Sequence, residues 1–323
     1  MAATTRVLVG VAVLVLLSAA PSPGASPPVT NIADAGATSV KESGDWIATG
    51  AGGVWLSDPP ANAIRRLDPV SGRVLKVVRV PWGPCEAMDV GYGAVWTATC
   101  KRSGLTRIEP ERNVAKDFVG LQIPASVGEE GSVGAGSGGV WVVVDGPACS
   151  ACRVARVNPT ALRVVAKIPV RDYAAGVRVG YGAVWVTNPQ LGLVQKIDPR
   201  KNAVVATTRV GPGPRFLDVG EGGVWTLNQV DGTVTRVDPR TAKVVARIPA
   251  GVVGDGGDLA VGGGWVWARG RDQLLVRIDS RSNRVVERYG PPSGSGSVAV
   301  GFGAAWVSAH DVRTVWRLPL PPR

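Results

Sequence analysis

The apolar residues of this chain gather in short runs, separated by turns rich in glycine or proline. From Val179 to Asp218, an apolar lead-in precedes a Gly-x-Gly turn, a Val-Trp run, a polar loop, an alternating run ending in Asp-Pro, a turn and a Val-rich run. The stretch from Val219 to Gly251 repeats this order. Such runs predict four short β-strands in each unit of about forty residues. The spacing typical of amphipathic helices is missing from every long stretch.

One tryptophan marks each unit, a strand beyond its glycine-rich turn. The seven markers are Trp55, Trp96, Trp141, Trp185, Trp225, Trp267 and Trp306, and they recur every 39 to 45 residues. A four-strand unit repeated seven times at this period is typical of a β-propeller with one unit per blade. The sequence therefore predicts an all-β fold, a seven-bladed β-propeller with four-stranded blades.

The last unit, from Val298, contains only three predicted strands. A strand-like piece at Val29–Gly36 resembles the later strand Ala246–Gly251. We expect this N-terminal piece to supply the missing strand, because closing the ring removes an open sheet edge. The propeller then occupies residues 44–323, and residues 26–43 form a linker with the closing strand.

Residues 1–25 have the pattern of a secretory signal peptide. Arg6 gives a positive start, Val7–Leu17 is an apolar run, and small residues with prolines follow. The apolar run is short for a bilayer span, and no later run is long enough. We expect a secreted or extracytoplasmic monomer with no membrane span after cleavage; an uncleaved N-terminal anchor is the alternative.

Two of the four cysteines flank the first hairpin of the second blade. Cys85 and Cys100 fall opposite each other if Val90 faces Val95 in that hairpin. A disulfide between them suits an exported protein.

The other two cysteines, Cys149 and Cys152, are then left to pair with each other. Their spacing resembles that of zinc ligands, but a zinc site needs two more soft ligands. No metal site is predicted from the cysteines.

Two motifs resemble known propeller families. Trp185-Val186-Thr187-Asn188, with Ile197-Asp198-Pro199 behind it, resembles the YVTN-repeat propellers. The Gly-Pro-Gly-Pro stretch before Val219 resembles streptogramin (virginiamycin B) lyase and its relatives. The resemblance spans all seven repeats and implies the propeller fold. For the lyase-type relatives it also implies His and Glu residues acting with a magnesium ion on one face of the ring, whereas this chain has a single histidine, His310.

The first strand of each blade is expected to line the central channel. The residue before its valine or threonine is Ala48, Asp89, Ser132, Arg178, Asp218, Ala260 or Ala299. Small residues suit the crowded axis, and Asp89, Arg178 and Asp218 depart from that pattern. Arg178 and Asp218 lie in neighbouring blades, so they form either a structural ion pair or a channel site for an ion or polar ligand.

The loops after the second and fourth strands are predicted to share one face of the ring. The opposite face then carries only copies of the Asp-Pro turn. Variable loops on a fixed scaffold usually carry function. The candidate ligand-binding residues combine aromatic surface with positive charge, and they are Trp82, Lys101, Tyr173, Arg215, Arg271 and His310. Such a set suits a polar or acidic ligand.

The formal net charge of +11 has two explanations. It indicates either attraction to an acidic polymer or surface, or solvated strand faces, since no run of like charge exceeds two residues. Export argues against nucleic acid as the partner. We expect an exported binding or scaffold propeller that recognises a protein or an anionic polymer. The alternative is a metal-assisted lyase or hydrolase using carboxylates at the channel mouth, and only that alternative involves a cofactor, magnesium.

Overall fold

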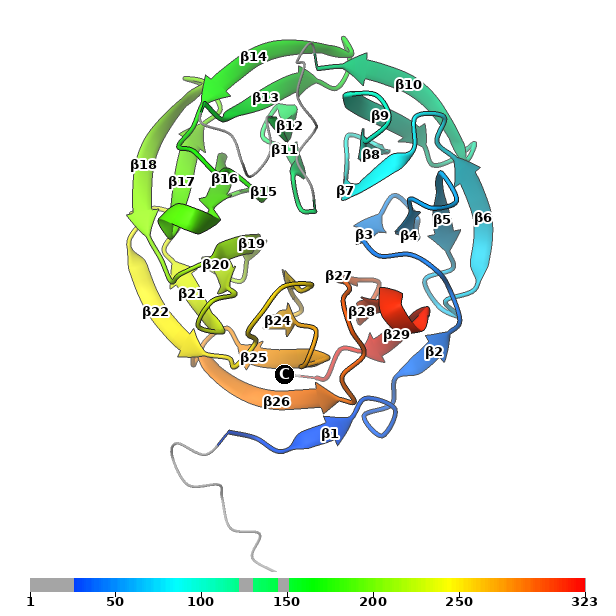
Figure 1. Ribbon diagram of the computed structural model, residues 1–323, viewed down its shortest axis with the longest axis vertical. Coiled ribbons are helices and arrows are strands. Elements are labelled where there is room, and N and C mark those ends of the chain that lie inside the picture. The colour runs from blue at the N-terminus through cyan, green and yellow to red at the C-terminus, as the bar shows by residue number, and fades with distance from the viewer. Residues whose placement is uncertain (1–25, 122–129, 145–150, 323) are drawn as a thin grey trace, which may run out of the picture.

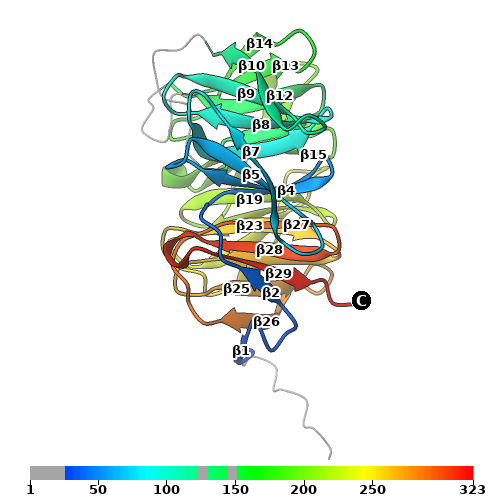
Figure 2. The same cartoon turned by 90° about the vertical axis from the view of Figure 1, so that its right-hand side faces the viewer.

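The computed structural model describes residues 26–121, 130–144 and 151–322, which form a ring of seven β-sheets around a central channel (Figure 1). Seen edge-on, the ring is a flat disc (Figure 2). The predicted seven-bladed propeller is thereby confirmed. The predicted signal peptide, residues 1–25, lies outside the described residues. Among the described residues, no helix has the length and apolar character needed to cross a membrane.

Each blade runs from an inner strand at the channel to an outer strand at the rim. Blade one consists of β3 (Ile47–Gly50), β4 (Gly53–Asp58), β5 (Ala63–Leu67) and β6 (Val74–Arg79), and blade two of β7 (Pro84–Gly91), β8 (Ala94–Thr99), β9 (Gly104–Glu109) and β10 (Val114–Gly120). Blade three consists of β11 (Val133–Gly136), β12 (Gly139–Val144), β13 (Arg153–Asn158) and β14 (Arg163–Pro169). Blade four consists of β15 (Val177–Gly180), β16 (Ala183–Asn188), β17 (Leu193–Asp198) and β18 (Ala203–Arg209). Blades five to seven consist of β19 (Pro214–Gly220), β20 (Gly223–Asn228), β21 (Thr233–Val237) and β22 (Val244–Pro249); β23 (Asp258–Gly262), β24 (Trp265–Arg269), β25 (Leu275–Asp279) and β26 (Arg284–Gly290); and β27 (Val298–Gly301), β28 (Ala304–Ala309) and β29 (Thr314–Pro319). Two short 3-10 helices, η1 (Pro189–Leu191) and η2 (His310–Val312), follow β16 and β28.

The radial position of a strand determines its hydrophobic pattern. All residues of the second strands, such as β4 and β16, are buried, because neighbouring blades cover both faces of the sheet. The outer strands, such as β14, alternate between exposed and less exposed residues, since one of their faces meets solvent. Continuous apolar runs therefore belong to the inner part of each blade, and alternating runs to the rim.

The marker tryptophans are fully buried, and cations from the third strand cover six of them, all but Trp96. In the first blade, the Trp55 Nε1 donates to the carbonyl of Gly50 at 2.9 Å, and the Arg66 Cζ lies 5.2 Å from the indole centroid. The Arg66 Nη1 also donates to the carbonyl of Pro110 in the next blade at 2.8 Å. We call the third-strand residues that make both contacts latch cations, and they are Arg66, Arg156, Lys196, Arg236 and Arg317. Some of the positively charged side chains therefore serve to join neighbouring blades.

The N-terminal segment closes the ring, but with different residues from those expected. The fourth strand of the last blade is β2 (Thr38–Val40), which pairs antiparallel with β29. The expected closing piece, Val29–Gly36, instead begins with β1 (Val29–Asn31), which pairs parallel with β26 and adds a fifth strand to blade six. Beyond β1 the chain turns, and Ile32 is buried against blades six and seven.

The predicted disulfide between Cys85 and Cys100 is confirmed, with their Cα atoms 5.2 Å apart. Val90 faces Val95 as expected, but the register of β7 against β8 shifts between Pro84 and Met88. The bond joins the start of β7 to the turn after β8. Cys149, the predicted partner of Cys152, lies outside the described residues.

Candidate functional site

The first strands line the central channel, which holds a cavity of about 240 Å³. Asp89, Arg178 and Asp218 all line it. The assignment of Ser132 to this ring was wrong. Gly134 occupies the position in blade three, because it pairs with Trp141 as Asp89 pairs with Trp96.

The side chain of Arg178 extends from blade four toward blade three. Its Nη1 donates to the carbonyls of Gly131 and Val133, both at 3.1 Å, and its Nε lies 4.0 Å from the Asp218 Oδ1. Its Cζ lies 5.6 Å from the Trp46 ring. These contacts describe a cation fixed mainly by backbone carbonyls, with a long ion pair to Asp218.

The two channel carboxylates tie neighbouring blades together. Asp89 accepts the backbone N–H of Ala135 in blade three at 2.7 Å, and Asp218 accepts that of Val261 in blade six at 2.7 Å. Burial raises the pKa of Asp218 to about 6, although Arg178 and the backbone N–H groups act in the opposite direction. Burial raises the pKa of Asp89 as well.

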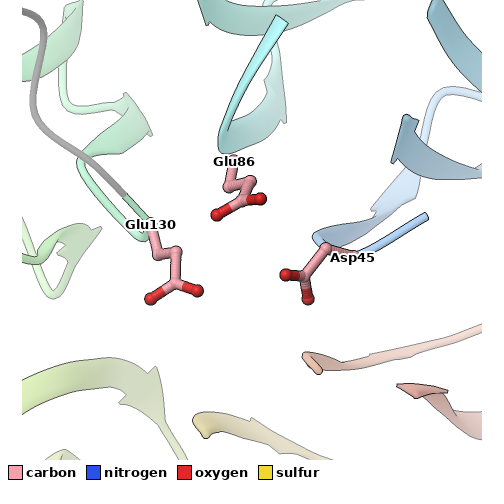
Figure 3. Close-up of side chains that lie close together, drawn as sticks. All are labelled: Asp45, Glu86 and Glu130. Carbon is pink, nitrogen blue, oxygen red and sulfur yellow. The ribbon is translucent and has the colours of Figure 1, made fainter. Parts of the chain in front are cut away.

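A second set of charged side chains lies nearer the mouth of the channel. Asp45, Glu86 and Glu130 come from the entries to blades one, two and three, and their carboxylates point toward one another (Figure 3). Carboxylate oxygens of all three lie within 4.8 Å of one another. We call these three residues the acidic cluster. Gly44 allows the chain to pass close to β4 before Asp45, because a Cβ there would lie 2.4 Å from the Leu56 Cγ.

Arg215 connects the acidic cluster to blade five. Its Nη2 lies 3.1 Å from the Glu130 Oε2. Burial raises the pKa of Glu130 to about 8, and Asp45 and Glu86 add to this rise while Arg215 opposes it. Burial also raises the pKa of Asp45, which is only 7% exposed.

The acidic cluster was missed by the sequence analysis, although the repeat contains the signal for two of its three members. Asp45 and Glu86 each stand three residues before the channel position of their blade. Arg215 holds the same place in blade five, whereas Ala175, Gly257 and Gly296 hold it in blades four, six and seven. Charged side chains at a position that other blades fill with small residues are not required by blade packing.

The predicted ligand-binding residues contact different neighbours. Arg215 lies at the acidic cluster. His310 lies in η2, where its Nδ1 is 3.3 Å from the Asp311 Oδ1, and it acts electrostatically on Asp45. Arg271, in the turn after β24, acts in the same way on Asp311.

Trp82 and Lys101 lie together in a separate group on blade two. The backbone N–H of Lys101 donates to the carbonyl of Trp82 at 3.0 Å. The Trp82 ring packs against Phe118 of the outer strand β10, and Arg102 covers both rings. Tyr173 stands exposed in the turn after β14, with a φ of +61°.

A groove lies on the face of the variable loops, between blades four and five. It measures about 580 Å³ and is bounded by η1 and by the connections after β18, β20 and β22. Apolar side chains of Leu191, Val210 and Val230 line it, together with Arg209 and Arg215. The groove therefore reaches from an exposed loop surface to the side chain that contacts the acidic cluster.

The residues present do not fit the histidine-containing magnesium site that the lyase resemblance implies. That site needs paired histidines, and His310 is the single histidine of the chain. Its imidazole is half-exposed beside Asp311. We derive no lyase chemistry from it.

The fold and the site define a seven-bladed β-propeller protein with charged groups at its channel mouth. No protein-family model and no curated protein matches the sequence. Among solved structures, the chain is similar to hydrazine synthase of Kuenenia stuttgartiensis, with a TM-score of 0.68 and 15% identity over 87% of this chain and 97% of that one. It is also similar to BamB from Moraxella catarrhalis, with a TM-score of 0.58 and 11% identity over 86% and 85% of the two chains. At these identities the likeness supports the propeller fold; the specific resemblance to YVTN-repeat or lyase families stays a prediction.

Proposed function

We propose that this protein is an exported binding propeller that holds a segment of a partner protein in the groove between blades four and five. The observation that carries the proposal is the groove itself, about 580 Å³ on the face formed by the variable loops. Export is supported by the signal-peptide pattern of residues 1–25 and by the Cys85–Cys100 disulfide, which suits an oxidising compartment.

The groove favours an acidic segment with an apolar side chain. Leu191 and Val230 offer apolar contact, and Val230 is 69% exposed although it is aliphatic. Arg209 is exposed at the groove, and its guanidinium has no hydrogen-bond or ion-pair partner among the described residues. In such a segment, the apolar residue would pack against Leu191 and Val230, and the flanking carboxylates would pair with Arg209.

Panning a random peptide library against the full chain tests this proposal. We expect enrichment of peptides with an aliphatic or aromatic residue beside Asp or Glu. Val230→Asp should weaken binding of the selected peptides at least about tenfold, because it removes apolar contact and repels their carboxylates. A tenfold loss corresponds to about 1.4 kcal/mol of binding free energy. Fluorescence polarisation of labelled peptides measures the change.

The matched control is Val245→Asp, the same change at a 53% exposed valine on the outer strand β22. It should leave peptide binding unchanged. Equal binding to Val230→Asp and the unsubstituted chain, or the absence of any enriched motif, would show that the groove is not the binding surface.

A further inference from the structure

We propose that Asp45, Glu86 and Glu130 together bind a hard divalent cation, Ca²⁺ in preference to Mg²⁺, at the mouth of the channel. The acidic cluster is built by three consecutive blades around the axis (Figure 3). The proposal does not depend on the peptide groove.

The spacing of the oxygen atoms suits calcium. Ligand oxygens lie about 2.3–2.6 Å from Ca²⁺, so two of them on opposite sides of the ion are about 5 Å apart. The oxygens of the acidic cluster, within 4.8 Å of one another, fall inside this limit. Mg²⁺ demands a near-ideal octahedron at about 2.0–2.1 Å and gives up its water reluctantly, so three carboxylates from separate blades suit the more flexible coordination of Ca²⁺ better.

Asp45 gives an independent reason to expect a ligand. Its side chain is more than nine-tenths buried, and Figure 3 shows its carboxylate directed into the acidic cluster. That carboxylate has no hydrogen-bond or ion-pair partner among the described residues; the backbone groups of Asp45 alone bond to Ser57 and Ser308. A buried carboxylate without a partner is costly, and a bound cation removes that cost.

The neighbouring positive side chains form their contacts with groups other than the Asp45 carboxylate. Arg215 contacts Glu130 at 3.1 Å. Arg269 acts on Asp45 only at longer range, since its guanidinium donates to the carbonyls of Ser308, Gly270 and Gly294. His310 is held beside Asp311. The carboxylate of Asp45 is therefore open to an external cation.

Calorimetric titration of Ca²⁺ into the metal-stripped full chain tests the proposal. We expect one Ca²⁺ per chain and a higher melting temperature in its presence, because a ligand that binds only the folded state stabilises it. Mg²⁺ should bind more weakly. Asp45→Asn keeps the side-chain shape and should weaken Ca²⁺ binding at least tenfold while the chain remains folded by circular dichroism.

Glu111→Gln is the control, because Glu111 is an exposed acid in a turn between β9 and β10 on the opposite face. It should bind Ca²⁺ like the unsubstituted chain. The proposal is overturned if Ca²⁺, Mg²⁺ and Mn²⁺ all give no heat and no shift in melting, or if Asp45→Asn binds Ca²⁺ unchanged. Stabilisation by ethylammonium or guanidinium but not by Ca²⁺ would also overturn it and assign the acidic cluster to an organic cation. Peptide binding in the groove should survive Asp45→Asn, so the two proposals fail separately.

Discussion

At the scale of single residues, the channel wall places carboxylates where solvent reaches them poorly. Asp218 accepts the backbone N–H groups of Val219 and Val261, and Arg178 stands 4.0 Å away. Burial nevertheless dominates and raises its pKa to about 6. Its role in the channel is the joining of blades five and six, and its ionised form carries a desolvation cost.

This cost makes stability depend on pH. An unfolded Asp titrates near about 3.9, so between about pH 4 and pH 6 the folded chain binds more protons at Asp218 than the unfolded chain does. Stability from this group therefore rises as pH falls through that window and is lost as pH rises through about 6. The contribution is at most about 3 kcal/mol, less what partial exposure screens.

Urea unfolding at pH 4.5 and pH 7 checks the prediction. Asp218→Asn should reduce the difference in unfolding free energy between the two pH values, even though it loses one of two accepted hydrogen bonds at both. Asp272→Asn, a change in an exposed turn, should retain the full difference. The prediction is wrong if Asp218→Asn and the unsubstituted chain give the same difference.

At the scale of elements, the sequence predicted the blades well and the joints between them poorly. Tryptophans and turns gave the strands because each lies within one blade and follows local patterns. The latch cations went unnoticed, although Arg or Lys follows most marker tryptophans by eleven residues, as Arg66 follows Trp55 and Arg236 follows Trp225. Their second partner lies in the next blade, about forty residues on, and only the closed ring brings the two together.

The latch predicts a graded loss of stability. Arg236 covers Trp225, and its Nη1 donates to the carbonyl of Ser280 at 2.8 Å and to Asn283 at 3.1 Å. Arg236→Ala should cost about 2–3 kcal/mol, because a cation–π contact and three hydrogen bonds are lost, the third to the carbonyl of Gly222. Arg236→Lys should cost less, since Lys196 makes the equivalent contacts in blade four.

Chemical denaturation of the variants measures these losses. The control is Arg240→Ala, in an exposed turn of the same blade, which should change stability by less than about 0.5 kcal/mol. If Arg236→Ala were as stable as Arg240→Ala, the latch would be an incidental contact.

At the scale of the whole molecule, the ring explains why the site was only partly predictable. The charged channel residues could be found from the repeat, because they share one position in each blade. The acidic cluster could not be assembled in the same way, since Glu130 is displaced by one residue from the equivalent position, Gly131. Of the six predicted ligand-binding residues, Trp82 packs against Phe118 of the outer strand β10, and the joint role of the six in binding stays a prediction. The position of a residue in the repeat predicts where it lies along its strand. The direction of a loop side chain depends instead on the residues packed around it.

Closure of the ring gives the last prediction, which compares chains that begin at Ser26, Ala37 and Glu42. The chain from Ala37 lacks β1 and the buried Ile32 but keeps β2, whereas the chain from Glu42 also lacks β2. Loss of Ile32 removes about 2 kcal/mol of apolar burial, which for a chain of this size lowers the melting temperature by a few degrees. Loss of β2 should cost more, because it also exposes the edge of β29 to pairing with other copies.

Differential scanning fluorimetry should therefore rank the melting temperatures of the chains from Ser26, Ala37 and Glu42 in that order, from highest to lowest. Light scattering should detect oligomers mainly for the chain from Glu42. A monomeric chain from Glu42 that melts with the chain from Ala37 would mean that β2 is dispensable and that the ring is held by the contacts between blades alone.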